Sequence, residues 1–274
     1  MSAFRDLSRS YSVLFAPPAA ALFFTIAILS AVIPAQVVAQ TAPGLTFRSV
    51  NEELGRRPRG GVIDLFSQQG QARSTPDSNT ADWFWGQISH RSGAADASRI
   101  LDASQLARTH TPFNVRRSDV QTILTTYALP IRRAAEAQNV SAALIAAIIY
   151  VESRGRANAV SPVGAVGLMQ LMPGTAADLG VADSSDPAQN IRGGTSYMDQ
   201  LLALHSGDAL LALASYNAGP GAVRRAGGVP NYAETRAYVP RVLAAWSVAR
   251  GLCATPPQTA RARCDFSATG TLLD

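Results

Sequence analysis

The sequence predicts an all-α domain over residues 118–250, preceded by a poorly ordered arm, and three observations support this fold class. Apolar residues recur at helical spacing, capping and turn residues interrupt the pattern at helix length, and no segment alternates as a strand does. The chain of 274 residues is 47% hydrophobic, so it can bury a core. Its composition excludes a collagen-like, wholly disordered or disulfide-dense protein.

Start and stop signals give the order of the expected helices. Ser118 opens the first with the Ser-x-x-Gln form of a capping box, and Pro130 kinks or breaks it before it continues to residue 138. Ser141 caps the second, which ends at the Gly-containing loop 153–166. Asp186 and Asp208 then act as N-caps. The remaining helices are expected over residues 187–206, 209–218 and 233–250, the last with Pro240 inside it.

Residues 1–39 have the order of a secretory signal. Arg5 and Arg9 precede the apolar run 19–33, and small residues lead up to Ala39. This order predicts cleavage after Ala39 and a periplasmic location. The alternative is a retained membrane anchor, but the apolar run is shorter than the roughly 20 residues that span the hydrocarbon core.

Residues 40–117 are predicted to form a polar, partly disordered arm. Turn-rich stretches at 56–61 and 73–82 interrupt it, and no helical or strand period is sustained. Within it, Trp83, Phe84 and Trp85 form an aromatic cluster. Two interpretations are open: a segment that packs onto the following domain, or a docking peptide for a partner.

Charge and histidine placement exclude several function classes. The net charge is +5 and all 24 basic residues are Arg, so Lys-dependent chemistry is ruled out. No long Arg stripe or aromatic platform suggests nucleic acid as a partner. His90, His110 and His205 are scattered and the acids lack calcium-loop spacing, so we expect no metal and no cofactor.

The tail 251–274 holds the only two cysteines, Cys253 and Cys264. In an exported protein this pair predicts a disulfide that closes a small loop. Closing about a dozen residues contributes roughly 3 kcal/mol in the chain-entropy model. Two unrelated free thiols are the alternative, and a zinc site would need more ligands.

Glu152 is an acid on an apolar helix face. It follows Ile149 by three residues and Ile148 by four, so a helix places its carboxylate among branched aliphatic side chains. Burial without a cation raises the pKa of such a carboxyl and keeps it ready to donate a proton, and the carboxyl end of the helix acts in the same direction. The alternative is an ion pair with Arg154 or Arg156.

Three ordered motifs accompany Glu152. The first contains Glu152 itself, Asn-Ala-Val-Ser-Pro at 158–162 and Gly-Leu-Met-Gln-Leu-Met-Pro at 167–173. Ala-Ser-Tyr-Asn-Ala-Gly-Pro-Gly at 214–221 and Glu-Thr-Arg-Ala-Tyr-Val at 234–239 follow. Together they resemble the lytic transglycosylases with a soluble-type catalytic domain, relatives of goose-type lysozyme. The resemblance implies a lysozyme-like helical fold with a substrate cleft.

The resemblance also implies a reaction. It is the cleavage of the MurNAc–GlcNAc β-1,4 bond of peptidoglycan glycan strands without net addition of water, with Glu152 as the single acid/base. Glu152 would protonate the glycosidic oxygen and then take a proton from the C6 hydroxyl of the same MurNAc, which closes a 1,6-anhydro ring. Because the substrate supplies the nucleophile, no second carboxylate is required. The other acid in the motifs, Glu234, stands at a helix start, which favours a capping or salt-bridge role.

Position within the motifs implies further site residues. Substrate-binding roles fall on Ser161, Gln170, Met172, Tyr216, Asn217 and Tyr238. Of these, Tyr238 matches a tyrosine that holds the acid in place. Each also has a structural alternative, such as capping a turn, bonding the backbone or packing in the core. Pro240 departs from the pattern two residues after Tyr238 and leaves the reach of that tyrosine open.

Three functions are therefore considered. A lytic transglycosylase leads, a muramidase of the same fold lets water resolve the intermediate, and a non-catalytic wall-binding protein is the third. The arm and the tail also allow a role beside an envelope-spanning secretion or conjugation machine.

Overall fold

The computed structural model describes residues 81–110 and 113–266; the predicted signal and residues 40–80 of the arm lie outside them. Within the described residues every regular element is a helix. Strand-like pairing there is limited to isolated bridges, which join Arg91 to Gly228, Val160 to Val166 and Val166 to Leu171. The all-α prediction is confirmed for this part of the chain.

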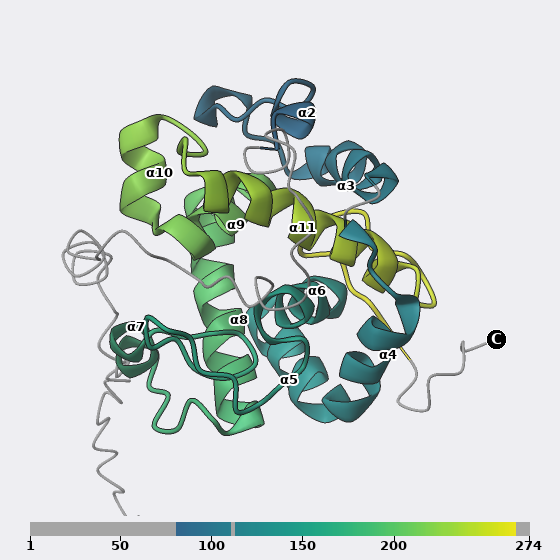
Figure 1. Cartoon of the computed structure of the whole chain (residues 1–274). Coiled ribbons are helices and arrows are strands. Elements are labelled where there is room, and N and C mark those ends of the chain that lie inside the picture. Colours follow the sequence, from purple (N-terminus) through teal and green to yellow (C-terminus); the bar gives the residue numbers. More distant parts are fainter. Residues whose placement is uncertain (1–80, 111–112, 267–274) are drawn as a thin grey trace, which may run out of the picture. The chain divides into compact units, whose positions relative to one another are not determined.

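The core is built around α6 (Ala142–Ser153), in which every residue except Val151 is buried. A helix that is apolar on all sides must be covered all round. Three helices provide this cover: α4 (Arg117–Thr126), α5 (Ala128–Gln138) and α11 (Ala233–Arg250). Figure 1 shows α6 between α5 and α11. The last turn of α6, which carries Glu152, is thereby fixed from several sides.

Two of the predicted caps differ from the structure. Ser118 does not cap the first helix: α4 begins at Arg117, and the Nε atom of Arg116 instead lies 3.0 Å from a carboxylate oxygen of Asp119. Ser141 does stand at the N-cap of α6, but its hydroxyl makes no cap bond, while its backbone N–H donates to the carbonyl of Ala260 at 2.8 Å. In both places a tertiary or charged contact replaces the local cap.

The break near Pro130 lies a little earlier than the sequence suggests. Tyr127 stands between α4 and α5, and Pro130 falls in the first turn of α5. A proline is tolerated there because the first N–H groups of a helix have no helical acceptor.

The acidic caps are confirmed on the other side of the domain. Asp186 accepts a hydrogen bond from the N–H of Gln189 at 2.8 Å and opens α8 (Pro187–Leu204). Asp208 accepts from the N–H of Leu211 at 2.9 Å and opens α9 (Ala209–Ala218). The shorter helices α7 (Pro173–Asp178) and α10 (Pro220–Ala226) complete this side.

The described part of the predicted arm contains helical segments separated by turns and extended stretches, and the extent of the arm stays a prediction. The helical segments are α2 (Asp82–Trp85), the 3-10 turns η2 (Ser92–Ala94) and η3 (Ala97–Arg99), and α3 (Ile100–Thr109), which packs on α11. The turns and α2 are too short to show a sustained period, whereas α3 has ten residues, as many as α4, and was missed as well. The side chain of Phe84 is fully buried in the core, as the packing interpretation of the aromatic cluster expects.

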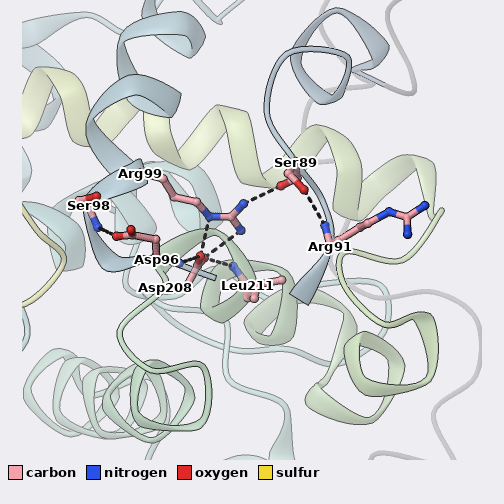
Figure 2. Close-up of polar contacts among 7 residues, drawn as sticks. All are labelled: Ser89, Arg91, Asp96, Ser98, Arg99, Asp208 and Leu211. Carbon is pink, nitrogen blue, oxygen red and sulfur yellow. Dashed lines mark hydrogen bonds and ion pairs between the residues drawn. The ribbon is translucent and has the colours of Figure 1, made fainter. Parts of the chain in front are cut away.

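One buried carboxylate ties this early segment to α9 (Figure 2). The side chain of Asp208 is fully buried and lies 2.5 Å from the Nε atom of Arg99. It also accepts from the backbone N–H of Asp96 at 2.9 Å, in addition to the cap bond to Leu211. Arg99 in turn donates to the carbonyl of Ser89 at 2.6 Å. The segment 89–99 and the start of α9 are therefore held as one unit.

The tail is closed by the predicted disulfide between Cys253 and Cys264. Both cysteines are buried, and the loop that they close includes Ala260, which meets the start of α6. In the part of the chain that the structure describes, none of the helices combines the length and apolar character that a bilayer span requires.

Candidate active site

Glu152 is buried at the contact between α6 and α11. Its side chain lies in the last turn of α6, and the residue is only 1% exposed. The Tyr238 hydroxyl, 86 positions further along the chain, donates to Oε1 of Glu152 at 2.7 Å. The second oxygen, Oε2, is buried and has no hydrogen-bond partner among the described residues. One oxygen of the carboxyl is thus fixed and the other is uncommitted.

Burial raises the pKa of Glu152 to about 8. The hydrogen bond from Tyr238 acts in the opposite direction, and the negative charge of Glu234 adds to the rise. The structure does not show the alternative, an ion pair between Glu152 and Arg154 or Arg156: none of the ion pairs within residues 81–110 and 113–266 includes Glu152. The guanidinium of Arg154 lies instead 4.0 Å from the ring centroid of Tyr150. Near neutral pH the carboxyl is therefore largely protonated.

Two buried tyrosines belong to the same site. Burial raises the pKa of Tyr216 and of Tyr238 well above the ordinary value, and the nearby Glu152 adds to both shifts. Both hydroxyls therefore remain hydrogen-bond donors. Tyr216 donates to the carbonyl of Met169 at 2.9 Å, which joins α9 to the loop after Glu152.

Ser161 and Gln170 shape that loop. Ser161 Oγ accepts from the N–H of Ala165 at 2.6 Å. The side-chain amide of Gln170 donates to the carbonyls of Ala159 and Gly167 at 3.0 and 2.8 Å, and Gln170 itself has a positive φ of 47°. Both side chains are buried, and their contacts are those of the structural alternatives: Ser161 stabilises a turn and Gln170 bonds the backbone. The Oε1 atom of Gln170 is buried without a hydrogen-bond partner among the described residues.

Asn190 is a buried residue of this region that the sequence analysis missed. Its Oδ1 accepts from the N–H of Met169 at 2.7 Å, and its Nδ2 donates to the carbonyls of Val166 and Ser184 at 3.0 and 2.9 Å. An amide on the buried face of an amphipathic helix was the available signal. Met169 is fully buried, while Met172 is half-buried at the start of α7.

Glu234 lies close enough to Glu152 to raise the pKa of that acid. The sequence instead predicted a capping or salt-bridge role for Glu234, and the structure shows neither among the residues that it describes. Partial burial of its carboxyl raises the pKa of Glu234 to about 7, although the residue as a whole is exposed, and Nδ2 of Asn217 donates to its Oε1 at 3.4 Å. The start of α11 has no side-chain cap bond, and no described ion pair includes Glu234. Thr235, also missed, donates to Oδ1 of Asn217 at 2.6 Å. The end of α9 and the start of α11 are therefore joined beside the two acids.

The structure thus brings Glu152, Tyr216, Asn217 and Tyr238 into one buried cluster, with the loop of Gln170 beside it. Residues 81–110 and 113–266 contain no group of three or more His, Cys, Asp or Glu side chains placed to hold a metal ion. The expectation of no metal stays a prediction. An acid that is protonated at neutral pH, with one oxygen fixed and one uncommitted, can act as a proton donor.

This fold and site agree with a family match. Residues 130–239 match the family model described as "Transglycosylase SLT domain", so the chain contains a domain of this family, as the three motifs suggest.

The similar proteins are named as transglycosylases. A "Transglycosylase" of Enterobacteria phage PRD1 is 46% identical over 87 residues, which are 31% of this chain and 32% of that protein. The "Soluble lytic murein transglycosylase" of Salmonella typhimurium is 36% identical over 130 residues, which cover 39% of this chain and 20% of that protein. This chain thus spans a third or less of the length of these two relatives.

Among solved structures, an inactive mutant of the lytic transglycosylase Slt from Pseudomonas aeruginosa is similar to this chain at 33% identity. The match covers 46% of this chain and 24% of that one, with a TM-score of 0.43.

Proposed function

We propose that this protein is an exported lytic transglycosylase, which cleaves the MurNAc–GlcNAc β-1,4 bond of peptidoglycan and leaves a 1,6-anhydroMurNAc end. The observation that carries the proposal is Glu152: a buried carboxyl with a pKa of about 8, anchored by Tyr238 through one oxygen. The name of the Salmonella typhimurium relative, a soluble lytic murein transglycosylase, supports the same substrate class.

The proposed reaction uses Glu152 twice. With Oε1 held by Tyr238, the proton on the carboxyl passes to the glycosidic oxygen as the bond from that oxygen to C1 of MurNAc breaks. The C6 hydroxyl of the same sugar then attacks C1, and its proton returns to Glu152. No water is consumed and the carboxyl ends in its starting state. The low polarity around Glu152 favours the neutral acid between turnovers.

The other motif residues are proposed to bind the glycan. Gln170 and Ser161 are proposed to act in glycan binding through the loop beside the acid, which their side-chain hydrogen bonds shape. The half-buried Met172 offers an apolar contact to a sugar ring. Tyr216 and Asn217 hold the end of α9 beside the acid.

The decisive experiment is the product spectrum of purified sacculi digested by the protein, read by mass spectrometry. Anhydro ends are expected from the wild type, and Glu152→Gln, which keeps the shape but removes the acid, is expected to release almost none. Equal clearing by wild type and Glu152→Gln would overturn the enzyme assignment and favour a non-catalytic wall-binding protein.

A muramidase is the second candidate, and Glu234 is the observation that favours it. This carboxylate raises the pKa of Glu152, so it lies within electrostatic reach of the acid, where a second carboxylate could activate water. Reducing MurNAc ends in the same mass spectra would support hydrolysis. Loss of those ends in Glu234→Gln, with anhydro ends retained, would assign the water to Glu234.

Export and partnership are proposed from the sequence. The signal order of residues 1–39 supports cleavage after Ala39 and a periplasmic site of action. Fractionation of cells that produce the full chain tests this: mature protein starting at Gln40 in the periplasm is expected, and uncleaved protein in the membrane fraction would indicate an anchor instead.

A role beside a secretion or conjugation machine is proposed for residues 40–117. A crosslinking pull-down with the full chain is expected to recover an envelope-machine component, and the same experiment with residues 40–80 deleted is its control. Recovery of glycan alone would count against this role.

A further inference from the structure

Pro240 leaves one carbonyl of α11 without its helical donor. In an α-helix the carbonyl of one residue accepts from the N–H four residues later. Pro240 lies inside α11 and has no N–H, so the carbonyl of Arg236 loses this bond. Tyr238 stands between these two residues, in the turn that the missing bond would have closed. Tyr238, which donates to Glu152, thus lies in the turn of α11 that lacks a helical hydrogen bond.

The indole of Trp85 supplies the missing donor. Its Nε1–H donates to the carbonyl oxygen of Arg236 at 2.9 Å, across 151 positions of sequence. Trp85 is 7% exposed, and Phe84 packs against its ring in a T-shaped arrangement with centroids 4.8 Å apart. The guanidinium of Arg236 lies 5.9 Å from the Trp85 ring centroid. A carbonyl shielded from water and left without a donor is unfavourable, so this bond stabilises the turn.

The segment that carries Trp85 is itself fixed beside α11. We call residues 81–99 the strap. The N–H of Val229 donates to the carbonyl of His90 at 2.8 Å, and the N–H of Ser92 donates to the carbonyl of Gly227 at 2.9 Å. A Cβ atom at Gly228 would lie 2.0 Å from the His90 carbonyl oxygen, so only glycine allows this approach.

At its other end, the strap is bound through the Arg99–Asp208 pair to the start of α9 (Figure 2). The strap therefore joins α9 and α11, the two helices whose ends meet at the acid. The position of Trp85 is therefore fixed by the contacts of the whole strap and not only by the short helix α2.

We propose that Trp85 is a positioning residue for Glu152, which acts through the carbonyl of Arg236 and the hydroxyl of Tyr238. The inference rests on the proposed function of Glu152 as the acid. Trp85 touches neither the acid nor a reacting atom. It holds the turn 236–240 so that the Tyr238 hydroxyl remains 2.7 Å from Oε1 of Glu152.

The test is a pair of substitutions and their combination. Trp85→Phe keeps the buried ring but removes the N–H, and kcat on sacculi is expected to fall about 10-fold, as the loss of one hydrogen bond implies, with KM little changed. Pro240→Ala gives residue 240 an N–H that can reach the Arg236 carbonyl. The double variant is therefore expected to recover most of the kcat that Trp85→Phe loses. Trp83→Phe, in the same short helix, is the matched control and should retain the wild-type kcat.

A second readout does not depend on catalysis. The Glu152 carboxyl is titrated by carbon NMR in the free full-length protein, alongside its neighbours Glu234, Tyr216 and Tyr238. Since the bond from Tyr238 stabilises the carboxylate, Trp85→Phe should raise the pKa of Glu152 further, and the double variant should return it toward the wild-type value.

The two readouts separate the possible failures. A Trp85→Phe protein with unchanged kcat and an unchanged Glu152 titration would overturn the inference, as would a double variant no better than Trp85→Phe. A chain that never cleaves glycan but shows the expected titration shifts would retain the positioning role of Trp85 and remove only the proposed function.

Discussion

The hydroxyl of Tyr238 donates to Oε1 of Glu152 at 2.7 Å, and this bond joins the last turn of α6 to the second turn of α11. It orients the carboxyl, and it lowers a pKa that burial otherwise raises. The same contact therefore sets both the geometry and the proton affinity of the acid.

Tyr238→Phe is expected to lower kcat about 10-fold, because one hydrogen bond to the acid is lost. The pKa of Glu152 should then rise above about 8, since the bond that favours the carboxylate is gone. The protonated acid is the active form, so the fall of kcat/KM at high pH should move to higher pH. A pH–rate profile measures this shift. A profile that moved to lower pH would contradict the arrangement.

Glu234→Gln is expected to shift the same profile in the opposite direction. Removing a negative charge near Glu152 lowers the pKa of the acid, so kcat/KM should begin to fall at a lower pH than in the wild type. Glu136→Gln, an exposed acid on α5, provides the comparison and should leave the profile unmoved. Coincident profiles for Glu234→Gln and the wild type would show that the two carboxylates do not interact.

Glu152→Gln should make the protein more stable at high pH. The folded-state pKa of Glu152 is raised from 4.5 to about 8, so the unfolded state loses its proton first as the pH rises. Stability contributed by the neutral acid is present below about pH 4.5 and is lost between there and about pH 8. The gain in the free energy of unfolding from Glu152→Gln should therefore grow across this window, to several kcal/mol. Urea unfolding at pH 4.5, 6 and 8 measures it, and a gain that is constant or shrinks with pH would refute the burial argument.

Asp208→Asn is expected to destabilise the protein by about 3–5 kcal/mol, because it leaves the largely buried Arg99 without its counter-charge. Asp265→Asn is the matched control: it removes an exposed ion pair with Arg263 and should cost less than about 1 kcal/mol. Urea unfolding of both variants gives the comparison. Equal losses would mean that the Asp208 network contributes no more than a surface pair.

The local pattern was sufficient to predict the helices of the core and the burial of Glu152. Ile148 and Ile149 fix the face of α6 on which Glu152 stands, and the caps Asp186 and Asp208 form bonds within three residues of themselves. Interactions of this range are encoded in neighbouring residues, which is why the sequence predicted them.

Contacts over long separations could not be read in this way. The bond from Trp85 to Arg236 spans 151 positions, and nothing in the sequence around either residue signals the other. The coupling of Glu234 to Glu152 likewise arises only when α11 packs on α6, so a local view assigned Glu234 to the helix start. Pro240 departs from the motif pattern, but the donor that replaces its missing N–H is Trp85, in an arm that the sequence predicts to be partly disordered.

The strap also determines where the chain can be shortened. A fragment trimmed to the family match at 130–239 would lack the indole over Arg236 and the guanidinium on Asp208, and it would stop before the end of α11. Recombinant versions should therefore begin no later than Ala81 and extend past Cys264. Boundaries drawn from homology alone would remove Trp85 and Arg99, whose contacts hold the helices beside Glu152.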